Sequence, residues 1–217
     1  MADEILKFEN VSKAYDEEIL SDINFTLQRG KSICVMAPSG KGKSTLLSIA
    51  GLLLAPTSGK VSICGNDTSR LNDNEKSKLR SEKIGFLFQH TQLCGELRAH
   101  ENISLPNFFQ KNESGRSRAE IEKLVDKQLN RFGLESRKYY YPNQLSIGQK
   151  RRIACARALF LHPELIIADE PTNDLDEGNK KVVIDALFEP VKAGKSALIF
   201  ATHDESVAKL ADEILTL

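Results

Sequence analysis

The segment at residues 37–45 has the residue types of a loop that binds phosphate. It follows the pattern G-x-x-x-x-G-K-S/T, with alanine at the first glycine position. Its residues are Ala37, Pro38, Ser39, Gly40, Lys41, Gly42, Lys43, Ser44 and Thr45. Glycines let backbone N–H groups close around phosphate oxygens, while the Lys43 ammonium would reach the terminal phosphates and the Ser44 hydroxyl would bind Mg²⁺. A strand-to-helix turn without a ligand is the alternative interpretation.

Two consecutive carboxylates end a short apolar segment far downstream. Asp169 and Glu170 directly follow residues 165–168, which have the side chains of a buried strand. Because a buried charge needs a partner, Asp169 is predicted to bind Mg²⁺ opposite Ser44. Glu170 is predicted to polarise a water molecule for attack on the terminal phosphate. An acidic pair that only opens the turn before Pro171 is the alternative.

A third motif narrows the class of protein. Residues 145–149, Leu-Ser-Ile-Gly-Gln, precede a basic segment and resemble the L-S-G-G-Q signature of the ATP-binding cassette (ABC) ATPases. The resemblance extends over essentially the whole chain. Four further residues match motifs of that family in the family's order, namely the adenine-stacking aromatic, the Q-loop, the D-loop and the switch histidine: Tyr15, Gln89, Asp176 and His203.

The resemblance implies a role for each matching residue. The catalytic residues would be Lys43, Glu170 and His203, with His203 bound to the γ-phosphate. The residues around the nucleotide would be Tyr15, Gln89 and the loop at residues 37–45. The ligands of Mg²⁺ would be Ser44, Gln89 and Asp169. The residues that contact the nucleotide of a second copy would be Ser146, Gly148 and Gln149, and Asp176 would cross the interface between the copies.

The resemblance also implies a function. The chain would bind ATP with Mg²⁺, hydrolyse it to ADP and phosphate, and close head to tail with a second ATP-binding subunit, expected to be identical. Closure would power transport or mechanical work through an integral membrane permease, contacted by residues 89–106. Residues 79–89 and 100–106 resemble the cassettes of lipoprotein-release, macrolide-export and cell-division systems. The chain would be cytoplasmic and held at the inner face of the membrane by its partner.

Ile147 stands where the ABC family has the first signature glycine. We expect its side chain either to shift the following helix or to point into the adjoining subdomain. This departure, together with Ala37, favours an alternative function, a nucleotide-gated regulatory module with little turnover.

Two other classes of protein fit the sequence less well. A soluble ABC protein of translation or DNA repair usually carries two cassettes or long insertions, and this sequence has one cassette and no such insertion. A P-loop kinase does not require the signature.

The elements that must position these residues read as an α/β fold. Apolar and β-branched segments predict strands at 5–11, 23–27, 32–36, 60–64, 84–88, 165–168, 197–201 and 213–217. Helical spacing predicts helices at 43–53, 118–132, 148–161, 178–191 and 205–210. We expect a P-loop NTPase core with a mixed sheet, an antiparallel N-terminal β part and an inserted α-helical subdomain. One ABC domain would span 1–217, with residues 1–89 and 163–217 as core and 90–162 as the helical subdomain.

The composition excludes some classes of protein. Thirty Lys and Arg balance thirty Asp and Glu, so the chain does not bind nucleic acid through bulk charge. No signal peptide or membrane-spanning segment is visible. The spacing of the four cysteines favours buried, reduced thiols over a zinc or redox site: Cys34, Cys64, Cys94 and Cys155.

Opposite charges are nevertheless concentrated in neighbouring segments. The segment after the signature carries bases and no acid: Lys150, Arg151, Arg152 and Arg157. Residues 162–177 carry acids and neither Lys nor Arg. We expect the basic segment to belong to a subdomain that is presented to the anionic nucleotide, and the acidic one to lie on the side of the metal and the attacking water.

Overall fold

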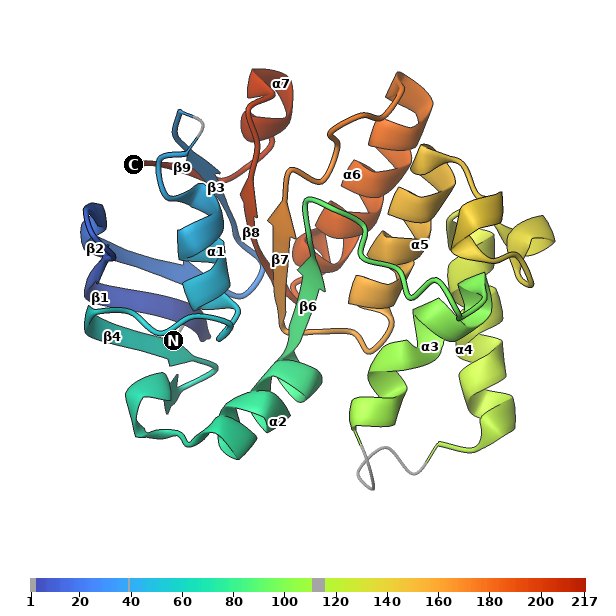
Figure 1. The fold of residues 1–217 in the computed structure, drawn as a ribbon, viewed down its shortest axis with the longest axis horizontal. Coiled ribbons are helices and arrows are strands. Elements are labelled where there is room, and N and C mark those ends of the chain that lie inside the picture. The colour runs from blue at the N-terminus through green and yellow to red at the C-terminus, as the bar shows by residue number, and fades with distance from the viewer. Residues whose placement is uncertain (1–2, 39, 111–115) are drawn as a thin grey trace.

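The computed structural model describes residues 3–38, 40–110 and 116–217 (Figure 1). An antiparallel sheet has the strand order β2 (Glu18–Gln28), β1 (Glu4–Ala14), β4 (Ser58–Ile63), β5 (Asn66–Asp67). A parallel sheet has the order β6 (Ile84–Leu87), β7 (Leu165–Asp169), β8 (Ala197–Ala201), β3 (Ser32–Met36), β9 (Glu213–Thr216). The α/β class and the antiparallel N-terminal part are confirmed.

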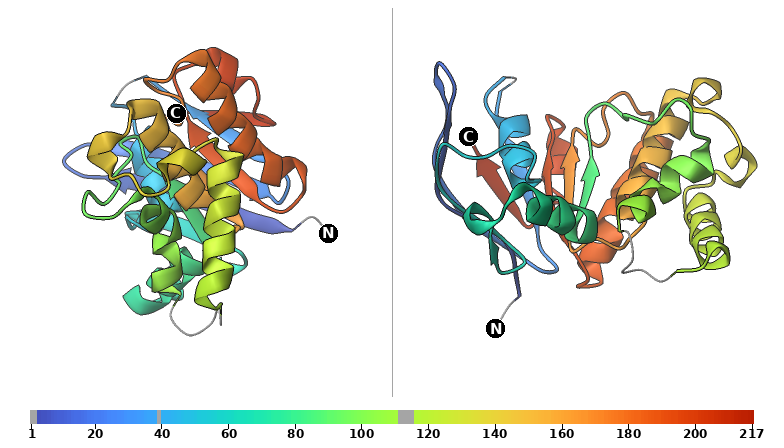
Figure 2. Two further views of the ribbon diagram at one scale, coloured as in Figure 1. Left: turned by 90° about the vertical axis from the view of Figure 1, so that its right-hand side faces the viewer. Right: turned by 60° about the horizontal axis from the view of Figure 1, so that its bottom comes forward.

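Helices cover both faces of the parallel sheet (Figure 1). The helices of the described residues are α1 (Lys43–Ala50), α2 (Asp73–Lys83), α3 (Ala99–Phe109), α4 (Arg118–Arg131), α5 (Ile147–Leu159), α6 (Glu177–Lys192) and α7 (Glu205–Ala208). Helix α1 lies between the two sheets, whereas α5 and α6 lie on the opposite face of the parallel sheet. Figure 2 shows α3 and α4 gathered at the end of the molecule that is farthest from the antiparallel sheet.

Strand β7 separates two apolar clusters because its side chains alternate between the two faces of the sheet. Leu165 and Ile167 pack into the cluster formed with α1 and the antiparallel sheet. Ile166 and Ala168 pack into the cluster formed with the helices on the other face. All four are fully buried, which explains why this strand is continuously apolar in the sequence.

Two helices were not predicted from the sequence. Helix α2 is highly polar and buries only Leu79, so it has no apolar periodicity, although the capping box of Asn72 and Glu75 marks its start. Helix α3 contains Pro106, and its buried positions include the polar residues Asn102 and Ser104. Both helices are therefore stabilised by caps and tertiary contacts that the hydrophobic pattern does not report.

Glu164 joins three parts of the core just before β7. Its carboxylate accepts hydrogen bonds from Lys83 Nζ at 2.6 Å and from the Arg29 guanidinium. The Lys83 bond, followed by the Arg29 bond, lowers the pKa of Glu164. Its contribution to stability is therefore fully present above the unfolded-state pKa of roughly 4.3 and is lost as the pH falls through the lowered folded-state pKa.

Glu164→Gln is expected to lower the free energy of unfolding at pH 7 by about 1 kcal/mol, because two cations lose their shared acceptor. Urea unfolding of both proteins should show this difference shrinking as the pH falls below the unfolded-state pKa. Glu189→Gln is the control, since that carboxylate is largely exposed and pairs with the single cation of Arg131 among the residues that the structure describes. A difference that grows on acidification would contradict the assignment.

Candidate functional site

The loop at residues 37–45 joins β3 to α1 and is curled around its own lysine. Lys43 Nζ donates to the carbonyl oxygens of Ala37 at 2.7 Å and Pro38 at 3.2 Å. Gly40 and Gly42 both have a left-handed backbone, with φ of 78° and 88°. Glycine adopts this conformation without strain, and successive N–H groups of such a backbone can point to one side, as in loops that bind phosphate. Ser39, also predicted to contact the nucleotide, lies outside the described residues.

Gly42 is required by space as well as by backbone conformation. A Cβ atom there would lie 2.8 Å from Leu20 Cδ2 and 3.0 Å from the Ile19 carbonyl oxygen, both on β2. The antiparallel sheet therefore supports the loop from behind. Ala37 does not have a positive φ, so its Cβ creates no backbone strain.

Ser44 and Asp169 meet where α1 begins and β7 ends. Ser44 Oγ donates to Asp169 Oδ2 at 2.7 Å. The Asp169 carboxyl is 8% exposed, and burial raises its pKa. A hydroxyl and a carboxylate oxygen thus converge from two elements that are 125 residues apart in sequence.

These donors fit Mg²⁺. The ion prefers oxygen ligands and is usually bound by one or two protein side chains together with phosphate oxygens and water. Among the residues that the structure describes, no group of three or more His, Cys, Asp or Glu side chains could hold a metal ion. The Ser44–Asp169 pair therefore suits an ion that arrives with a nucleotide better than a permanently bound one.

Glu170 and His203 form the next layer of the site. The His203 ring Nδ1 lies 2.9 Å from Glu170 Oε2, and the His203 backbone N–H lies 3.4 Å from the same oxygen. Glu170 is 8% exposed whereas His203 is 70% exposed, so the ring lies over the carboxylate on the solvent side. The Glu170 backbone is left-handed, with φ of 46°, and its N–H donates to the Ala201 carbonyl at 2.9 Å.

Gln89 and Tyr15 lie on the periphery of this group. Gln89 follows β6 and is exposed. Tyr15 is also exposed, in the turn between β1 and β2, with Lys13 Nζ 5.0 Å from its ring centroid. The hairpin that carries Tyr15 is the one whose residue Ile19 contacts Gly42, which places an aromatic ring on the β element beside the phosphate loop.

The signature segment (residues 145–149) lies on a different part of the molecule. Ser146 caps α5 by accepting from the Gln149 N–H at 3.2 Å, and Gln149 Oε1 accepts from the Ser146 N–H at 3.0 Å. Ile147 is 64% exposed at the first position of α5. The expectation that Ile147 would point into the adjoining subdomain is therefore wrong, because its side chain faces solvent. The cap at the start of α5 is intact.

Gly148 contacts Asn179, a residue that the sequence interpretation missed. A Cβ at Gly148 would lie 2.8 Å from the Asn179 side chain. Asp176 holds that side chain by accepting from the Asn179 N–H at 2.9 Å and from Nδ2 at 2.5 Å. The bond from the Asn179 backbone is the main reason that the pKa of Asp176 is lowered. The predicted D-loop residue and the signature segment are therefore neighbours within one chain.

The predicted residues fall into two groups. The phosphate loop, Asp169, Glu170 and His203 meet at the ends of β3, β7 and β8. The signature segment lies at the start of α5, which packs on α3 and α6, and Figure 1 shows α5 and α1 separated by the parallel sheet. One chain therefore presents these two groups on separate parts of its surface.

Three arginines of the basic segment bind main-chain carbonyls of their own chain. Arg152 donates to the Phe132 carbonyl at 2.6 Å. Arg151 and Arg157 donate to carbonyls of residues 88–92. Main-chain carbonyls leave no mark in the sequence, so a run of arginines could not reveal that its partners are internal.

The four cysteines are free thiols. Cys34 and Cys155 are buried, and burial raises the pKa of Cys155 to about 12 and that of Cys34 to about 11. Cys64 is half-buried, and Cys94 is exposed, so the expectation of four buried thiols is wrong for Cys94. Thiols with raised pKa values are poor nucleophiles and poor metal ligands at neutral pH.

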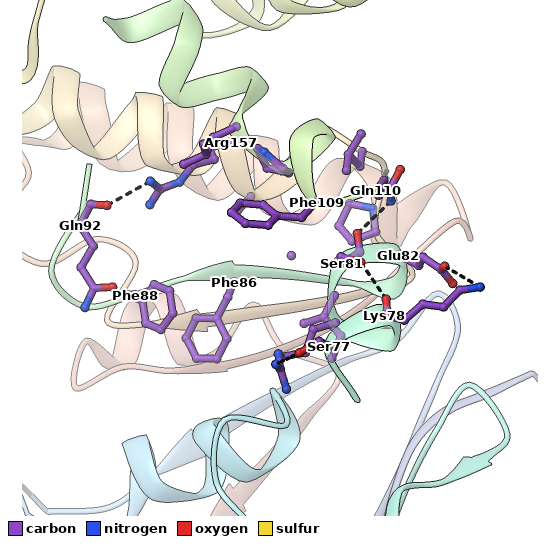
Figure 3. Close-up of a pocket in the computed structure, with 18 of the residues that line it drawn as sticks. Ser77, Lys78, Ser81, Glu82, Phe86, Phe88, Gln92, Phe109, Gln110 and Arg157 are labelled. Carbon is purple, nitrogen blue, oxygen red and sulfur yellow. Dashed lines mark hydrogen bonds and ion pairs between the residues drawn. The ribbon is translucent and has the colours of Figure 1, made fainter. Parts of the chain in front are cut away.

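A groove of about 810 Å³ lies between α2, α3 and α5. Aromatic side chains of Phe86, Phe88 and Phe109 line it, and Glu82, Gln92 and Arg157 lie around them (Figure 3). None of the described residues of the phosphate loop, 37–38 and 40–45, lines this groove. It is therefore a second feature of the surface, separate from the Ser44–Asp169 pair.

Within residues 3–38, 40–110 and 116–217, no helix is long and apolar enough to cross a membrane.

Comparisons with known proteins agree on one family. The ABC transporter family model matches residues 20–173. The lipoprotein-releasing system ATP-binding protein LolD 1 of Rhodopseudomonas palustris is 38% identical, covering 99% of this chain and 96% of that protein. The macrolide export ATP-binding/permease protein MacB of Bartonella henselae is 38% identical over 100% of this chain and 33% of that protein. A dimeric ATP-binding cassette in a post-hydrolysis state bound to ADP and Pi matches with a TM-score of 0.92, at 36% identity, over 98% of this chain and 94% of that chain.

Proposed function

Because this chain belongs to the ABC transporter family, we propose that its phosphate loop, Asp169, Glu170 and His203 form the ATP hydrolysis site of a transporter. The chain is an ATP-binding, ATP-hydrolysing subunit that acts as a dimer with a membrane permease partner. The observation that carries the proposed site is the 2.7 Å bond between Ser44 and Asp169, beside Lys43 at the start of α1. It brings together the hydroxyl and carboxylate oxygens that Mg²⁺–ATP requires.

Each residue of this group has a distinct task. Lys43 would exchange its bonds to the Ala37 and Pro38 carbonyls for bonds to phosphate oxygens. Ser44 and Asp169 would bind Mg²⁺, with Gln89 as a further oxygen ligand. The bound ion would neutralise charge on the phosphates during transfer.

Glu170 is the general base in this proposal. Its carboxylate lies directly after Asp169, at the mouth of the site, and would orient and deprotonate the attacking water. His203 holds Oε2 of Glu170 through its ring and backbone nitrogens. The exposed ring of His203 can then also reach the γ-phosphate, which was the role inferred from the family resemblance.

A second copy would complete the site. The start of α5 carries the partial positive charge of a helix N-terminus, and Ser146, Gly148 and Gln149 present it at the surface. The separation of this segment from the phosphate loop of the same chain supports contact with the nucleotide of the partner. Asp176, placed next to the same helix start through Asn179, would lie at that interface.

The groove is the proposed contact for the permease. Gln92, Leu105 and Pro106 of segment 89–106 line it, and its aromatic lining is suited to an apolar segment of a membrane subunit. Relatives that act in lipoprotein release and macrolide export support a permease of that group. Docking there would hold the chain at the inner face of the membrane.

Hydrolysis should depend on a divalent cation. Purified chain is expected to release phosphate from ATP in the presence of Mg²⁺ and to stop when EDTA removes the ion. Ser44 and Asp169 would supply only two of the six ligands of Mg²⁺, so these residues alone would not retain it. Asp169→Asn should require much more Mg²⁺ for the same rate, whereas Asp185→Asn, on the exterior of α6, should not. EDTA-insensitive hydrolysis would reject the proposed site.

A further inference from the structure

Two arginines of α5 hold the main chain of the segment that follows β6. Arg151 donates to the Phe88 carbonyl at 2.7 Å and to the Gln89 carbonyl at 2.6 Å. Arg157, almost two turns later, donates to the Thr91 carbonyl at 3.1 Å and to the Gln92 carbonyl at 3.0 Å. Four carbonyls in a stretch of five residues are thus bound to one helix.

The Arg151 guanidinium is unusually placed for a charged group. The residue is only 4% exposed, and the acceptors of its two hydrogen bonds, on Phe88 and Gln89, are neutral carbonyls rather than carboxylates. Burial lowers its pKa, although the charges of Asp174, Asp169 and Glu170 oppose this effect. A buried cation of this kind is costly unless its geometry is maintained, so segment 88–92 is held firmly against α5.

The bonded segment borders both functional features. Gln89 belongs to the proposed metal and nucleotide group. Phe88, Gln92 and Arg157 line the groove, and Figure 3 shows the Arg157 guanidinium directed at Gln92 along one side of it. A displacement of this segment would therefore also displace Gln89 and α5.

Helix α5 also connects the two arginines to the signature segment. It begins directly after Ser146, so the arginines and the signature segment are parts of one rigid element. We infer that Arg151 and Arg157 are positioning residues that make segment 88–92 and α5 move as one body.

This inference rests on the proposed roles of Gln89 and the signature segment. A purely structural role for the arginines would give a different result, because it predicts lower thermal stability and nothing else. The test therefore measures the turnover rate, the affinity for ATP, and hydrogen exchange of residues 88–92 and 146–149. Exchange is compared with and without ATP in chains that also carry Glu170→Gln.

Arg151→Ala and Arg157→Ala are expected to lower kcat by about 10- to 100-fold, the usual effect of a misplaced catalytic group, while ATP affinity is unchanged. In these variants ATP should still protect residues 146–149 but no longer residues 88–92. Arg151→Lys keeps the charge and one hydrogen bond, so it should recover part of kcat and also keeps the test valid if alanine prevents folding. Arg131→Gln is the matched control, since Arg131 also donates to a main-chain carbonyl, that of Ala186, but does not touch residues 88–92.

The inference is overturned if the Arg151 and Arg157 variants behave like Arg131→Gln, with lower melting temperatures but unchanged kcat and unchanged ATP-linked exchange at residues 88–92. If the unmodified chain hydrolyses no ATP, the proposed function fails. Exchange at residues 88–92 in the Glu170→Gln chain still decides the inference, because it requires binding of ATP and no turnover.

Discussion

Glu170→Gln is expected to lower the rate of ATP hydrolysis by roughly 10²–10⁴-fold, the usual contribution of a general base. The amide keeps the size of the carboxylate and can still lie beside His203, but it cannot accept a proton from water. Binding of ATP should persist, since Lys43, Ser44 and Asp169 are unchanged. Steady-state phosphate release and the affinity for a fluorescent ATP analogue together measure both expectations.

The control for this variant is Glu177→Gln. Glu177 is an exposed carboxylate in the first turn of α6, and its ion pair is with Lys180. The Glu177→Gln chain should hydrolyse ATP at the same rate as the unmodified chain. Residual hydrolysis in the Glu170→Gln chain close to that of the control would mean that another group deprotonates the water.

Gly148→Ala is expected to lower hydrolysis by about 100-fold without preventing ATP from binding to each copy, because it displaces the start of α5. Alanine favours helix by itself, so a loss must come from the contact of the new Cβ with Asn179, at 2.8 Å. Asn179 cannot easily move away, since Asp176 holds its side chain. Phosphate release, ATP affinity and sedimentation of the ATP-bound dimer measure the effect.

A second substitution tests the cause. Adding Asn179→Ala to Gly148→Ala removes the atoms that the new Cβ meets, and should restore part of the lost activity. Ile147→Ala is the matched control at the neighbouring position, where the side chain is exposed and no packing is lost. Full activity of Gly148→Ala, or no recovery in the double variant, would show that the spacing between α5 and Asn179 does not matter.

The sequence predicted the site best where functional side chains directly follow a buried strand. Asp169 and Glu170 could be recognised because carboxylates are rare directly after a buried apolar strand, and the phosphate loop because glycine and lysine occur at diagnostic positions. The structure adds that Ser44 and Asp169 touch. The sequence alone could predict only that they approach, because the pairing of β7 with β8 and of β8 with β3 decides their distance.

The interactions that escaped prediction share a physical cause. Arg151 and Arg157 bind carbonyls, which every residue carries, so their partners have no signature in the sequence. Asn179 matters through the space beside Gly148, and a contact between two helices is invisible without their packing. Ile147 differs from the family pattern but faces solvent, and only the structure separates a departure that changes packing from one that does not.

The position of β7 has a consequence for how the molecule unfolds. One strand supplies side chains to both apolar clusters. If either cluster unfolds, the other therefore loses the side chains that β7 contributes to it. Unfolding should therefore be cooperative over the whole chain, with a single transition. Asp169 is the last residue of this shared strand. A nucleotide bound there raises the stability of the folded state by mass action, and helices α3 and α4, at the far end of the molecule, are stabilised along with the sheet.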